Sequence, residues 1–578
     1  MRILFLTHGF NSLSQRLYLE LTERGHEVFI EYDINDAVTI EAVSLCEPNL
    51  IVAPYLKRAI PEAVWRHHVC LVVHPGIRGD RGPSALDWSI MNGETHWGVT
   101  VLQANGEMDA GDIWASVDFP MREAGKSSLY RDEVTQAATQ ALLQAVDLFQ
   151  KGDFVPEPLD YLRNDVRGRP HPAMTQAARA IDWGRDSTAS VLRKIRAADG
   201  HPGVLDSLYG IPCYLFNAFA EDTLAGEPGA VVAQRNGAIC RATVDGAVWI
   251  THLRRKPVDE KTFKLPAAIV LGEALTDVPE SNAPWLVPNT SRTYADIRYE
   301  ESNLVGYLYF DFYNGAMSTD QCVRLTQAYR FAQSRDTQVI VLMGGPDFWS
   351  NGIHLNLIEA ADSPAEESWR NINAVNDLAQ AIITTDTHLT ISAIRGCAGA
   401  GGVFLALAAD RVYARDGSIL NPHYKGMGNL YGSEYWTYLL PRRVGAAKAR
   451  TLTQNRLPIS ARTAKRLGLI DDHIKTGLGD FQQQIVEIAE GLANDPDCPK
   501  KLVAKRQRRQ HDEDEKPLES YRTQEMERMK LNFYGFDPSY HVARYNFVFK
   551  VPHSWTPLHL AAHRLVGRQR HVMRQGLN

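Results

Sequence analysis

The chain of 578 residues is poor in cysteine, has no long apolar run and carries no excess of positive charge. Its seven cysteines are scattered, odd in number and never spaced as C-x-x-C, which argues against a disulfide framework and a structural zinc site. No stretch reaches the roughly 18 apolar residues of a membrane span, and the apolar run at the N-terminus is too short for a signal-peptide core. The sequence therefore predicts a cytoplasmic protein without a metal site or a membrane segment.

Composition and charge are those of an ordinary enzyme-sized globular protein. Hydrophobic residues make up 44% and charged residues 22%, and the formal net charge is -6, so nothing in the composition attracts nucleic acid. A chain of this length exceeds a single hydrophobic core, and two or three domains are expected. We expect domains at residues 1–165, 166–289 and 290–578, with proline-containing linkers near both boundaries and a charged helical tail at the end.

The first part of the chain alternates strands and helices. Strands are predicted at residues 3–7, 26–32 and 50–53, with helical segments between them, which indicates a parallel α/β sheet. Residues 70–73 (CLVV) are a further strand that leads directly into His74. Ligands usually bind at the carboxyl ends of the strands in such a sheet, so His74 is a candidate functional residue rather than a histidine held in a loop.

A series of motifs begins at His74. They are HPGIRGDRGP at 74–83, WGVT at 97–100 and EMDAGDI at 107–113. This series resembles the folate-dependent formyltransferases, whose motifs are N-x-H-P, R-G, G-V-T and D-x-G. The resemblance continues at 181–183 (IDW) and 193–197 (RKIRA), which are similar to the start of the small C-terminal barrel domain of the methionyl-tRNA enzymes.

This resemblance implies that 10-formyltetrahydrofolate is the formyl donor and that His74 and Asp109 act at the formyl carbon. In the family the imidazole stabilises the tetrahedral intermediate or relays a proton, and the carboxylate helps to deprotonate the nucleophile. The family's asparagine two residues before the histidine is Val72 here, and the loss of one such donor typically lowers the rate by ~10²–10³. The departure argues against amine formylation; a thiolate nucleophile and an inactive folate-binding remnant are the two alternatives.

Two different strand patterns follow the formyltransferase motifs. Residues 231–253 contain short strands separated by Asn-Gly and Asp-Gly turns, a hairpin pattern typical of a small barrel. A predicted strand at 337–343 ends in the glycine-containing turn 344–352, and a later strand ends in the glycine-rich turn RGCAGAGG at 395–402, followed by a helix. Strand, glycine turn and helix N-terminus in that order direct backbone N–H groups toward an oxygen atom.

These two turns resemble the oxyanion hole of the enoyl-CoA hydratase/isomerase (crotonase) superfamily, in which paired backbone amides bind the carbonyl of a CoA thioester. By motif, Asn351 matches the first amide donor in the family's F-x-A-G-A-D, and Gly401 matches the second in N-G-x-A-x-G-G-G. Asn314, Gly315 and Ala316 fall where the family contacts the adenine of CoA. The resemblance therefore implies a CoA-binding site.

The two glutamates with which hydratases position water are absent. Phe404 occupies the first position and the second falls within 422–424, so hydration of a double bond is not expected. Tyr424 stands in or beside the second position, and Glu434 lies in the loop 432–436 that caps the acyl pocket in the family. A phenol and a carboxylate facing a small carbonyl could move a formyl proton while CO is released. Simple packing of Tyr424 and a solvated Glu434 are the structural alternatives.

The whole pattern resembles the maturation proteins of [NiFe] hydrogenases, which join a formyltransferase-like half to a crotonase-like half. That resemblance implies an enzyme that transfers formyl from 10-formyltetrahydrofolate to CoA and then decarbonylates formyl-CoA to CO and CoA, with hydrogenase maturation proteins as partners. A hydrolase that gives formate, an acyl-CoA enzyme with a vestigial folate half and a non-catalytic scaffold are the alternatives. The predicted fold is α/β: an open sheet, a small β-barrel-like middle part and a crotonase-like α/β spiral with a helical tail.

Overall fold

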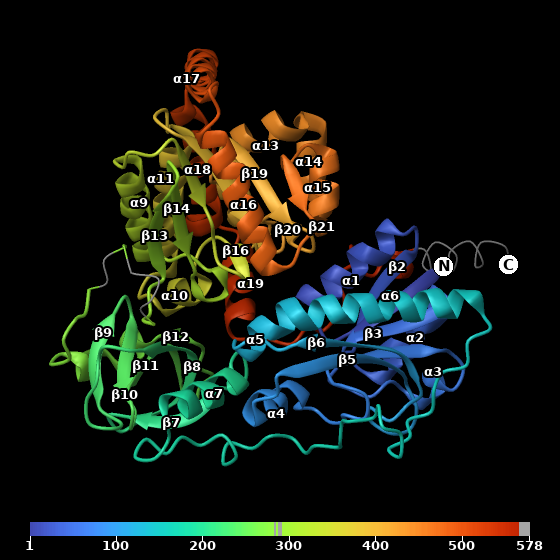
Figure 1. Cartoon of the computed structure of the whole chain (residues 1–578). Coiled ribbons are helices and arrows are strands. Elements are labelled where there is room, and N and C mark those ends of the chain that lie inside the picture. The colour runs from blue at the N-terminus through green and yellow to red at the C-terminus, as the bar shows by residue number, and fades with distance from the viewer. Residues whose placement is uncertain (283–284, 287–291, 566–578) are drawn as a thin grey trace.

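The computed structural model describes residues 1–282, 285–286 and 292–565. Figure 1 shows three bodies, each built around its own sheet or pair of sheets, in the order of the chain. The predicted domain boundary at residue 289, with part of the linker before it, lies outside the described residues.

The first sheet has the order β2-β1-β3-β4-β5-β6. Its strands are β1 (Arg2–Thr7), β2 (Glu27–Tyr32), β3 (Leu50–Tyr55), β4 (Cys70–His74), β5 (His96–Gln103) and β6 (Ile113–Pro120). Its helices are α1 (Ser12–Glu23), α2 (Asp36–Cys46), α3 (Glu62–Trp65), α4 (Ala85–Asn92), α5 (Lys126–Leu129), the π-helix η1 (Tyr130–Val134) and α6 (Thr135–Lys151). The predicted α/β class is confirmed, and His74 is the last residue of its strand, as predicted.

The four strands for which a parallel sheet was predicted are parallel, and two further strands of the sheet are antiparallel. β1 to β4 are parallel, whereas β5 runs antiparallel to β4, and β6 antiparallel to β5. The chain returns beside β4 after α4 instead of crossing over the sheet, and β6 then adds as a hairpin partner. β3 also continues through Pro54, where a strand end was predicted. The β1–β3 register shifts between Phe5 and Thr7, and an irregularity of this kind tolerates the missing proline N–H.

The second sheet is antiparallel, with the order β7-β8-β11-β10-β9, and β12 pairs with β11. Its strands are β7 (Val204–Leu208), β8 (Ile211–Glu221), β9 (Val231–Arg235), β10 (Ala238–Ala242), β11 (Ala247–Arg255) and β12 (Leu265–Pro266). Its helices are α7 (Thr188–Ala198), α8 (Ala267–Leu271) and the 3-10 helix η2 (Gly272–Leu275). The predicted Asn-Gly turn joins β9 to β10, and both of its residues have positive φ (48° and 83°).

The third body is a spiral of two sheets, with the orders β13-β14-β15-β17-β19-β22 and β16-β18-β20-β21. Three times in succession a strand of the larger sheet is followed by a strand of the smaller one, as expected for the crotonase-like fold. The strands are β13 (Ile297–Ser302), β14 (Val305–Phe310), β15 (Val339–Leu342), β16 (Phe348–Ser350), β17 (Leu389–Ile394), β18 (Cys397–Gly399), β19 (Arg411–Arg415), β20 (Ile419–Asn421), β21 (Ile459–Ser460) and β22 (Asp472–Ile474).

Helices surround the spiral and continue into the tail. They are the 3-10 helix η3 (Tyr313–Gly315), α9 (Thr319–Gln333), α10 (Leu355–Ala360), α11 (Pro364–Ile383), α12 (Gly401–Leu407), α13 (Trp436–Val444), α14 (Ala446–Asn455), α15 (Ala461–Leu467), α16 (Leu478–Ala493), α17 (Cys498–Glu515), α18 (Leu518–Tyr534) and α19 (Ser539–Val548). Ser318 and Gln321 form a capping box at the start of α9. No helix of the described residues is long and apolar enough to cross a membrane.

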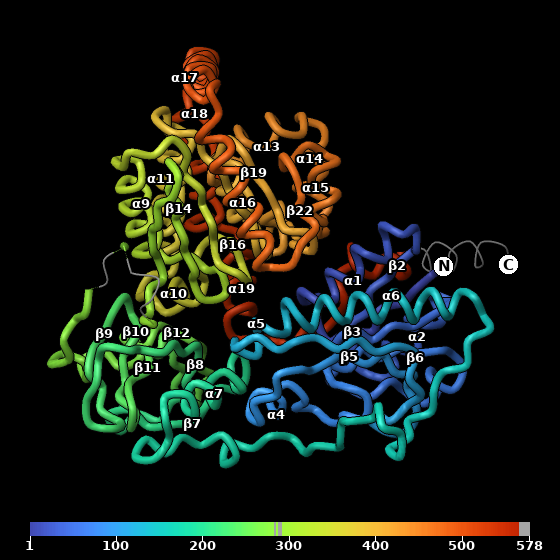
Figure 2. Tube along the Cα trace, viewed as in Figure 1, coloured from blue at the N-terminus to red at the C-terminus, as the bar shows by residue number. Residues whose placement is uncertain are grey.

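The segment that follows α19 returns to the beginning of the chain. Figure 2 shows the segment after α19, in red, passing to the first sheet. There the Ile30 N–H donates to the carbonyl of Leu560 (3.2 Å), and the buried Glu31 accepts hydrogen bonds from His563 (2.9 Å) and Arg564 (2.8 Å). Although burial opposes ionisation, these bonds lower the pKa of the Glu31 carboxyl. The tail therefore fastens the crotonase-like body to the first sheet.

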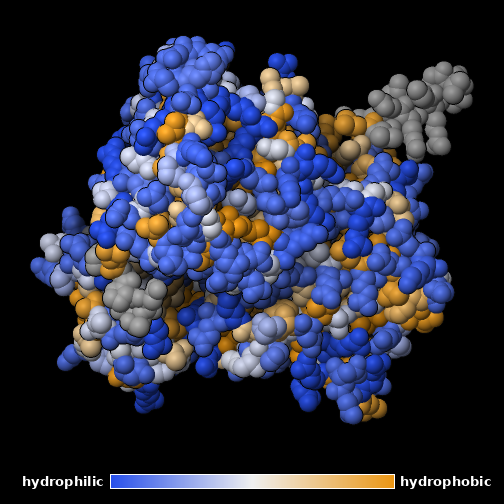
Figure 3. Space-filling view, turned by 45° about the horizontal axis from the view of Figure 1, so that its top comes forward, coloured by the Kyte–Doolittle hydropathy of each residue, from blue (hydrophilic) through white to orange (hydrophobic). Residues whose placement is uncertain are grey.

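The surface gives little further guidance. On the face in Figure 3 hydrophilic side chains predominate and apolar ones are scattered, which is normal for a folded protein. This face therefore indicates no particular binding site.

Candidate functional site

The turn that follows β4 fixes the position of His74. The Trp97 indole N–H donates to the carbonyl of Pro75 (3.0 Å), and the Thr100 hydroxyl donates to the carbonyl of Gly76 (2.8 Å). Both donors lie on β5, the antiparallel neighbour of β4. A Cβ at Gly76 would lie 2.5 Å from His74 Nε2, so only glycine lets the chain pass this close to the ring. His74 itself is 4% exposed.

The His74 imidazole lies between two carboxylates. Its Nε2 is 2.7 Å from Asp80 Oδ2, and its Nδ1 is 3.6 Å from Oδ2 of Asp109, the other residue predicted for this site. Asp109 has positive φ (52°), and its Oδ2 also accepts the Gly82 N–H at 3.1 Å. The shorter contact to Asp80 holds the orientation of the ring, and the Asp109 side chain is the more exposed of the two carboxylates, 15% against 1%.

Sequence reasoning missed Asp80. It lies within the quoted motif, but the family pattern assigns that segment only an R-G pair, and a spacing of six residues does not predict a contact between side chains. The second carboxylate oxygen of Asp80, Oδ1, is buried and has no hydrogen-bond partner among the residues that the structure describes. An unpartnered buried acceptor beside a histidine is unusual, which makes Asp80 a further candidate functional residue.

The second predicted pair meets inside the crotonase-like body. Tyr424 and Glu434 are 6% and 1% exposed, and the phenol O–H donates to Glu434 Oε2, which also accepts the Ser433 N–H at 3.2 Å. The Phe404 ring stacks on Tyr424 with 5.3 Å between ring centroids. The side chain at the position of the missing hydratase glutamate thus packs against the phenol instead of holding water.

Burial changes the acid–base properties of both groups. It raises the pKa of Glu434 to about 7, against the hydrogen bonds from Tyr424 and Ser433 that favour the ionised form. Burial, together with the charge of Glu434, raises the pKa of Tyr424 well above its ordinary value. Glu434 can therefore accept or release a proton near neutral pH, while Tyr424 stays a neutral donor.

Gly401 lies next to the free oxygen of Glu434. A Cβ at Gly401 would collide with Glu434 Oε1, so the glycine allows this approach. Gly401 is the first residue of α12, and its N–H has no hydrogen-bond partner among the described residues. A free N–H at a helix N-terminus can polarise a carbonyl oxygen.

Asn351, the other predicted amide donor, is already engaged. Its backbone N–H donates to the carbonyl of Gly315 at 2.7 Å, and its side-chain amide donates to the carbonyl of Asn314 at 2.8 Å. The Ala316 N–H turns back to the carbonyl of Tyr313 (3.4 Å). The structure therefore joins Asn351 to the predicted adenine loop, and the N–H would have to leave Gly315 before it could bind a thioester.

Cations lie between this loop and the other two bodies. Arg131 of η1 donates to Asn314 Oδ1 (3.1 Å) and to Asp347 (3.0 Å). Lys264 donates to the Tyr313 hydroxyl (3.0 Å), and burial lowers the pKa of its ammonium to about 8. Burial also lowers the pKa of Lys550, whose charge acts on Lys264. Within the described part of the chain neither lysine forms an ion pair with a carboxylate, so both are suited to an anionic ligand.

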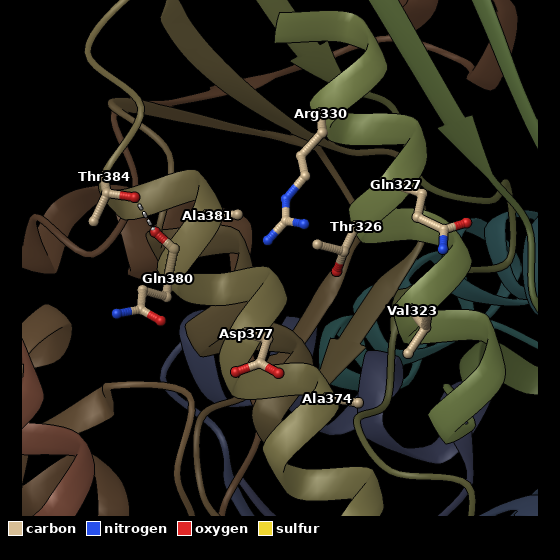
Figure 4. A pocket seen from close by; sticks show the side chains of 9 residues that line it. All are labelled: Val323, Thr326, Gln327, Arg330, Ala374, Asp377, Gln380, Ala381 and Thr384. Carbon is tan, nitrogen blue, oxygen red and sulfur yellow. Dashed lines mark hydrogen bonds between the residues drawn. The ribbon is translucent and has the colours of Figure 1, made fainter.

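A surface groove of about 350 Å³ lies away from these residues, between α9 and α11. Figure 4 shows Arg330 and Asp377 directed into it from the two helices. Asp377 forms an ion pair with Arg522 (2.8 Å), and none of the predicted site residues lines the groove. The candidate sites are therefore the His74 cluster and the Glu434 cluster.

Known protein families match the three bodies of the chain separately. The formyl transferase family model matches residues 32–146, the formyl transferase C-terminal domain matches 173–264, and enoyl-CoA hydratase/isomerase matches 313–552. Methionyl-tRNA formyltransferase of Trichlorobacter lovleyi is 27% identical over 242 residues, 41% of this chain and 75% of that one.

Two similar proteins extend over nearly the whole chain. Hydrogenase maturation factor HoxX of Bradyrhizobium diazoefficiens is 56% identical over 565 residues, 98% of each chain. The crystal structure of HypX from Aquifex aeolicus in complex with tetrahydrofolic acid matches with a TM-score of 0.94 and 49% identity, covering 98% of this chain and 99% of that one.

Proposed function

The chain belongs to the HypX/HoxX family of hydrogenase maturation factors, and from this membership we propose that it makes carbon monoxide from 10-formyltetrahydrofolate in two steps. The first step transfers formyl to CoA at His74, and the second decarbonylates formyl-CoA at Glu434. The observation that carries the proposal is the buried Tyr424–Glu434 pair, in a crotonase-like fold that has Phe404 where hydratases have a catalytic glutamate.

His74 and Asp109 accept and donate the proton in the first step. Asp80 holds the imidazole, and the His74–Asp109 pair takes the proton of the CoA thiol and returns one to the folate nitrogen. The bond from sulfur to the formyl carbon forms as the carbon–nitrogen bond breaks, so the products are formyl-CoA and tetrahydrofolate. A thiolate needs less help than an amine, which fits Val72 in place of the family's asparagine. The Aquifex relative binds tetrahydrofolic acid, which supports a folate in this body.

Glu434 takes the formyl proton in the second step. The Gly401 N–H polarises the carbonyl oxygen, and Tyr424 donates its hydrogen bond to the carboxylate that accepts the proton. The electron pair of the C–H bond stays on carbon as the lone pair of CO. The C–S bond breaks with its electron pair going to sulfur, an oxygen lone pair completes the C–O bond, and the proton passes to the thiolate. Formyl-CoA thus gives CO and CoA with no other reactant. The Asn351 N–H can become a second donor to the carbonyl only after it leaves the carbonyl oxygen of Gly315.

We place the anionic part of CoA at the cations between the bodies. Arg131 contacts Asn314 and Lys264 contacts the neighbouring Tyr313, while the charge of Lys550 acts on Lys264; neither lysine forms an ion pair with a carboxylate in the described chain. Phosphates can supply that missing charge. A thiol on the long CoA arm then has a high effective concentration at both sites.

The test mixes purified protein with 10-formyltetrahydrofolate and CoA under anaerobic conditions and follows CO through the spectral shift of deoxymyoglobin. CO that depends on CoA supports the proposal. Formate without CO would instead make the protein a hydrolase, and no turnover would make it a scaffold for other maturation proteins. Adding a hydrogenase maturation protein that binds the iron then tests for transfer of the CO to a partner.

A further inference from the structure

One face of α18, in the C-terminal tail, lies against the loop that carries Glu434. Asn532 accepts the Tyr431 N–H (3.0 Å), and the Met529 sulfur accepts the Gly432 N–H (3.2 Å). Glu525 lies one and two turns before them, at the helical spacing i, i+4 and i+7 that brings side chains to one face. The backbone of the loop is therefore bound by a helix remote from it in sequence.

Glu525 makes most of these contacts. It is completely buried, and its carboxylate accepts hydrogen bonds from the Tyr435 N–H (3.0 Å), the Thr437 N–H (2.8 Å), the Thr437 hydroxyl (2.6 Å) and the Ser433 hydroxyl (3.3 Å). Within the described chain no lysine or arginine forms an ion pair with it. The charge of a buried carboxylate is normally balanced by a cation. Here hydrogen-bond donors of the Glu434 loop stabilise it instead.

The loop needs such support because its backbone is strained. Glu434 and Tyr435 are consecutive residues with positive φ, 60° and 58°, a conformation that side chains with a Cβ rarely adopt. Asn376 Oδ1 accepts the Glu434 N–H at 2.8 Å, and Glu525 accepts the next N–H, that of Tyr435. Strain of this kind persists only where the surroundings fix it, and it commonly occurs at functional sites.

We propose that Glu525 is a positioning residue for decarbonylation, which holds the strained loop so that Glu434 Oε1 lies beside Gly401. This inference rests on the proposed function of Glu434. Glu525 touches no reacting atom and acts through the N–H groups of Tyr435 and Thr437. Burial, reinforced by the charge of Glu434, also raises the pKa of Glu525 to about 7, which agrees with two carboxyls that share one enclosed space.

The test compares Glu525→Ala and Glu525→Gln with Glu527→Gln, an exposed glutamate of the same helix. Each protein receives formyl-CoA, and CO release is measured over a range of concentrations. Glu525→Ala should lower kcat on the order of 10²-fold with little change in KM, as expected for a misplaced catalytic group. Glu525→Gln keeps the shape and one acceptor oxygen, so it should recover part of this loss, and Glu527→Gln should behave like the wild type.

A separate assay distinguishes positioning from damage to the whole body. Formyl transfer from 10-formyltetrahydrofolate to CoA occurs at His74, and it should continue in Glu525→Ala, with formyl-CoA accumulating. Equal kcat for CO release in Glu525→Ala and the wild type would overturn the inference, as would an equal loss of both steps. If Glu525→Ala is insoluble, the same two assays are applied to Glu525→Gln and Thr437→Val, because each of these removes only part of the hydrogen bonding. A loss of CO release without a loss of formyl transfer in these variants would support the inference, and unchanged CO release would overturn it. Wild-type protein that makes no CO from formyl-CoA would refute the proposed function instead.

Discussion

The two candidate sites hold a proton in different ways. The His74 imidazole contacts a carboxylate on each side, 2.7 Å and 3.6 Å away, and the cluster lies where a strand ends and loops begin. Glu434 has no cation beside it among the described residues; it is buried, contacts the Tyr424 phenol and lies on a strained loop. At the first site, hydrogen bonds to carboxylates determine where the proton is held. At the second site, burial determines it. Mutations should therefore separate the two chemistries.

Glu434→Gln should have the largest effect on this comparison. The amide fills the same space and cannot accept the formyl proton, so CO release from formyl-CoA should fall by roughly 10³-fold. Formyl transfer should persist, with formyl-CoA accumulating in the presence of 10-formyltetrahydrofolate and CoA. The deoxymyoglobin assay and chromatography of the thioester measure the two steps. Undiminished CO release would remove Glu434 from the mechanism.

His74→Ala should give the reverse result. Loss of the imidazole should lower formyl transfer by roughly 10²- to 10⁴-fold, and Asp109→Asn should act in the same direction, because the pair handles one proton. Added formyl-CoA should still yield CO at the wild-type rate. An equal loss of both steps would mean that the chain has one shared site, and a variant that loses only stability would show that His74 is structural.

The local parts of both sites could be predicted from the sequence. The strand ending at His74 and the glycine-rich turn before Gly401 are consecutive residues, and their pattern alone indicates a backbone directed at a ligand. The hairpin at Asn236 is of the same kind, since Asn-Gly specifies its turn type. Such features depend on neighbours in the chain and need no knowledge of tertiary packing.

The remaining features depend on contacts between distant segments. The bond from the Asn351 N–H to Gly315 joins two loops and cancels the free amide that the motif predicts. The contact of Glu525 with a loop 90 residues earlier and that of Glu31 with His563 have no local signal. The antiparallel direction of β5 is likewise invisible, because a strand pattern does not encode the direction of its neighbour. In each case tertiary packing selects one of several arrangements that the sequence allows.

Asp80→Asn should sharpen the account of the His74 site with a smaller effect. The amide can still contact Nε2 but removes a charge-assisted bond, so formyl transfer should slow by about 10- to 100-fold, the value of one hydrogen bond to a charged group. CO release from added formyl-CoA should not change. Asp112→Asn, an exposed aspartate three residues after Asp109, is the matched control. A rate equal to that of the control would show that Asp109 alone orients the ring.

The smallest expected effect is on the free energy of unfolding. It tests whether burial determines the pKa of Glu434. Its pKa rises from an ordinary 4.5 to about 7 on folding, so the folded chain holds its proton more tightly than the unfolded chain. The contribution of this group to the free energy of unfolding is therefore complete below pH 4.5 and is lost as the pH rises to about 7, by about 1–3 kcal/mol. Glu434→Gln does not titrate and should lose less stability over that interval. Urea unfolding at pH 5 and pH 8 measures the difference between the two proteins. An equal change in the free energy of unfolding of the two proteins would mean that the Glu434 carboxyl is solvated. Burial would then not distinguish the Glu434 site from the His74 site.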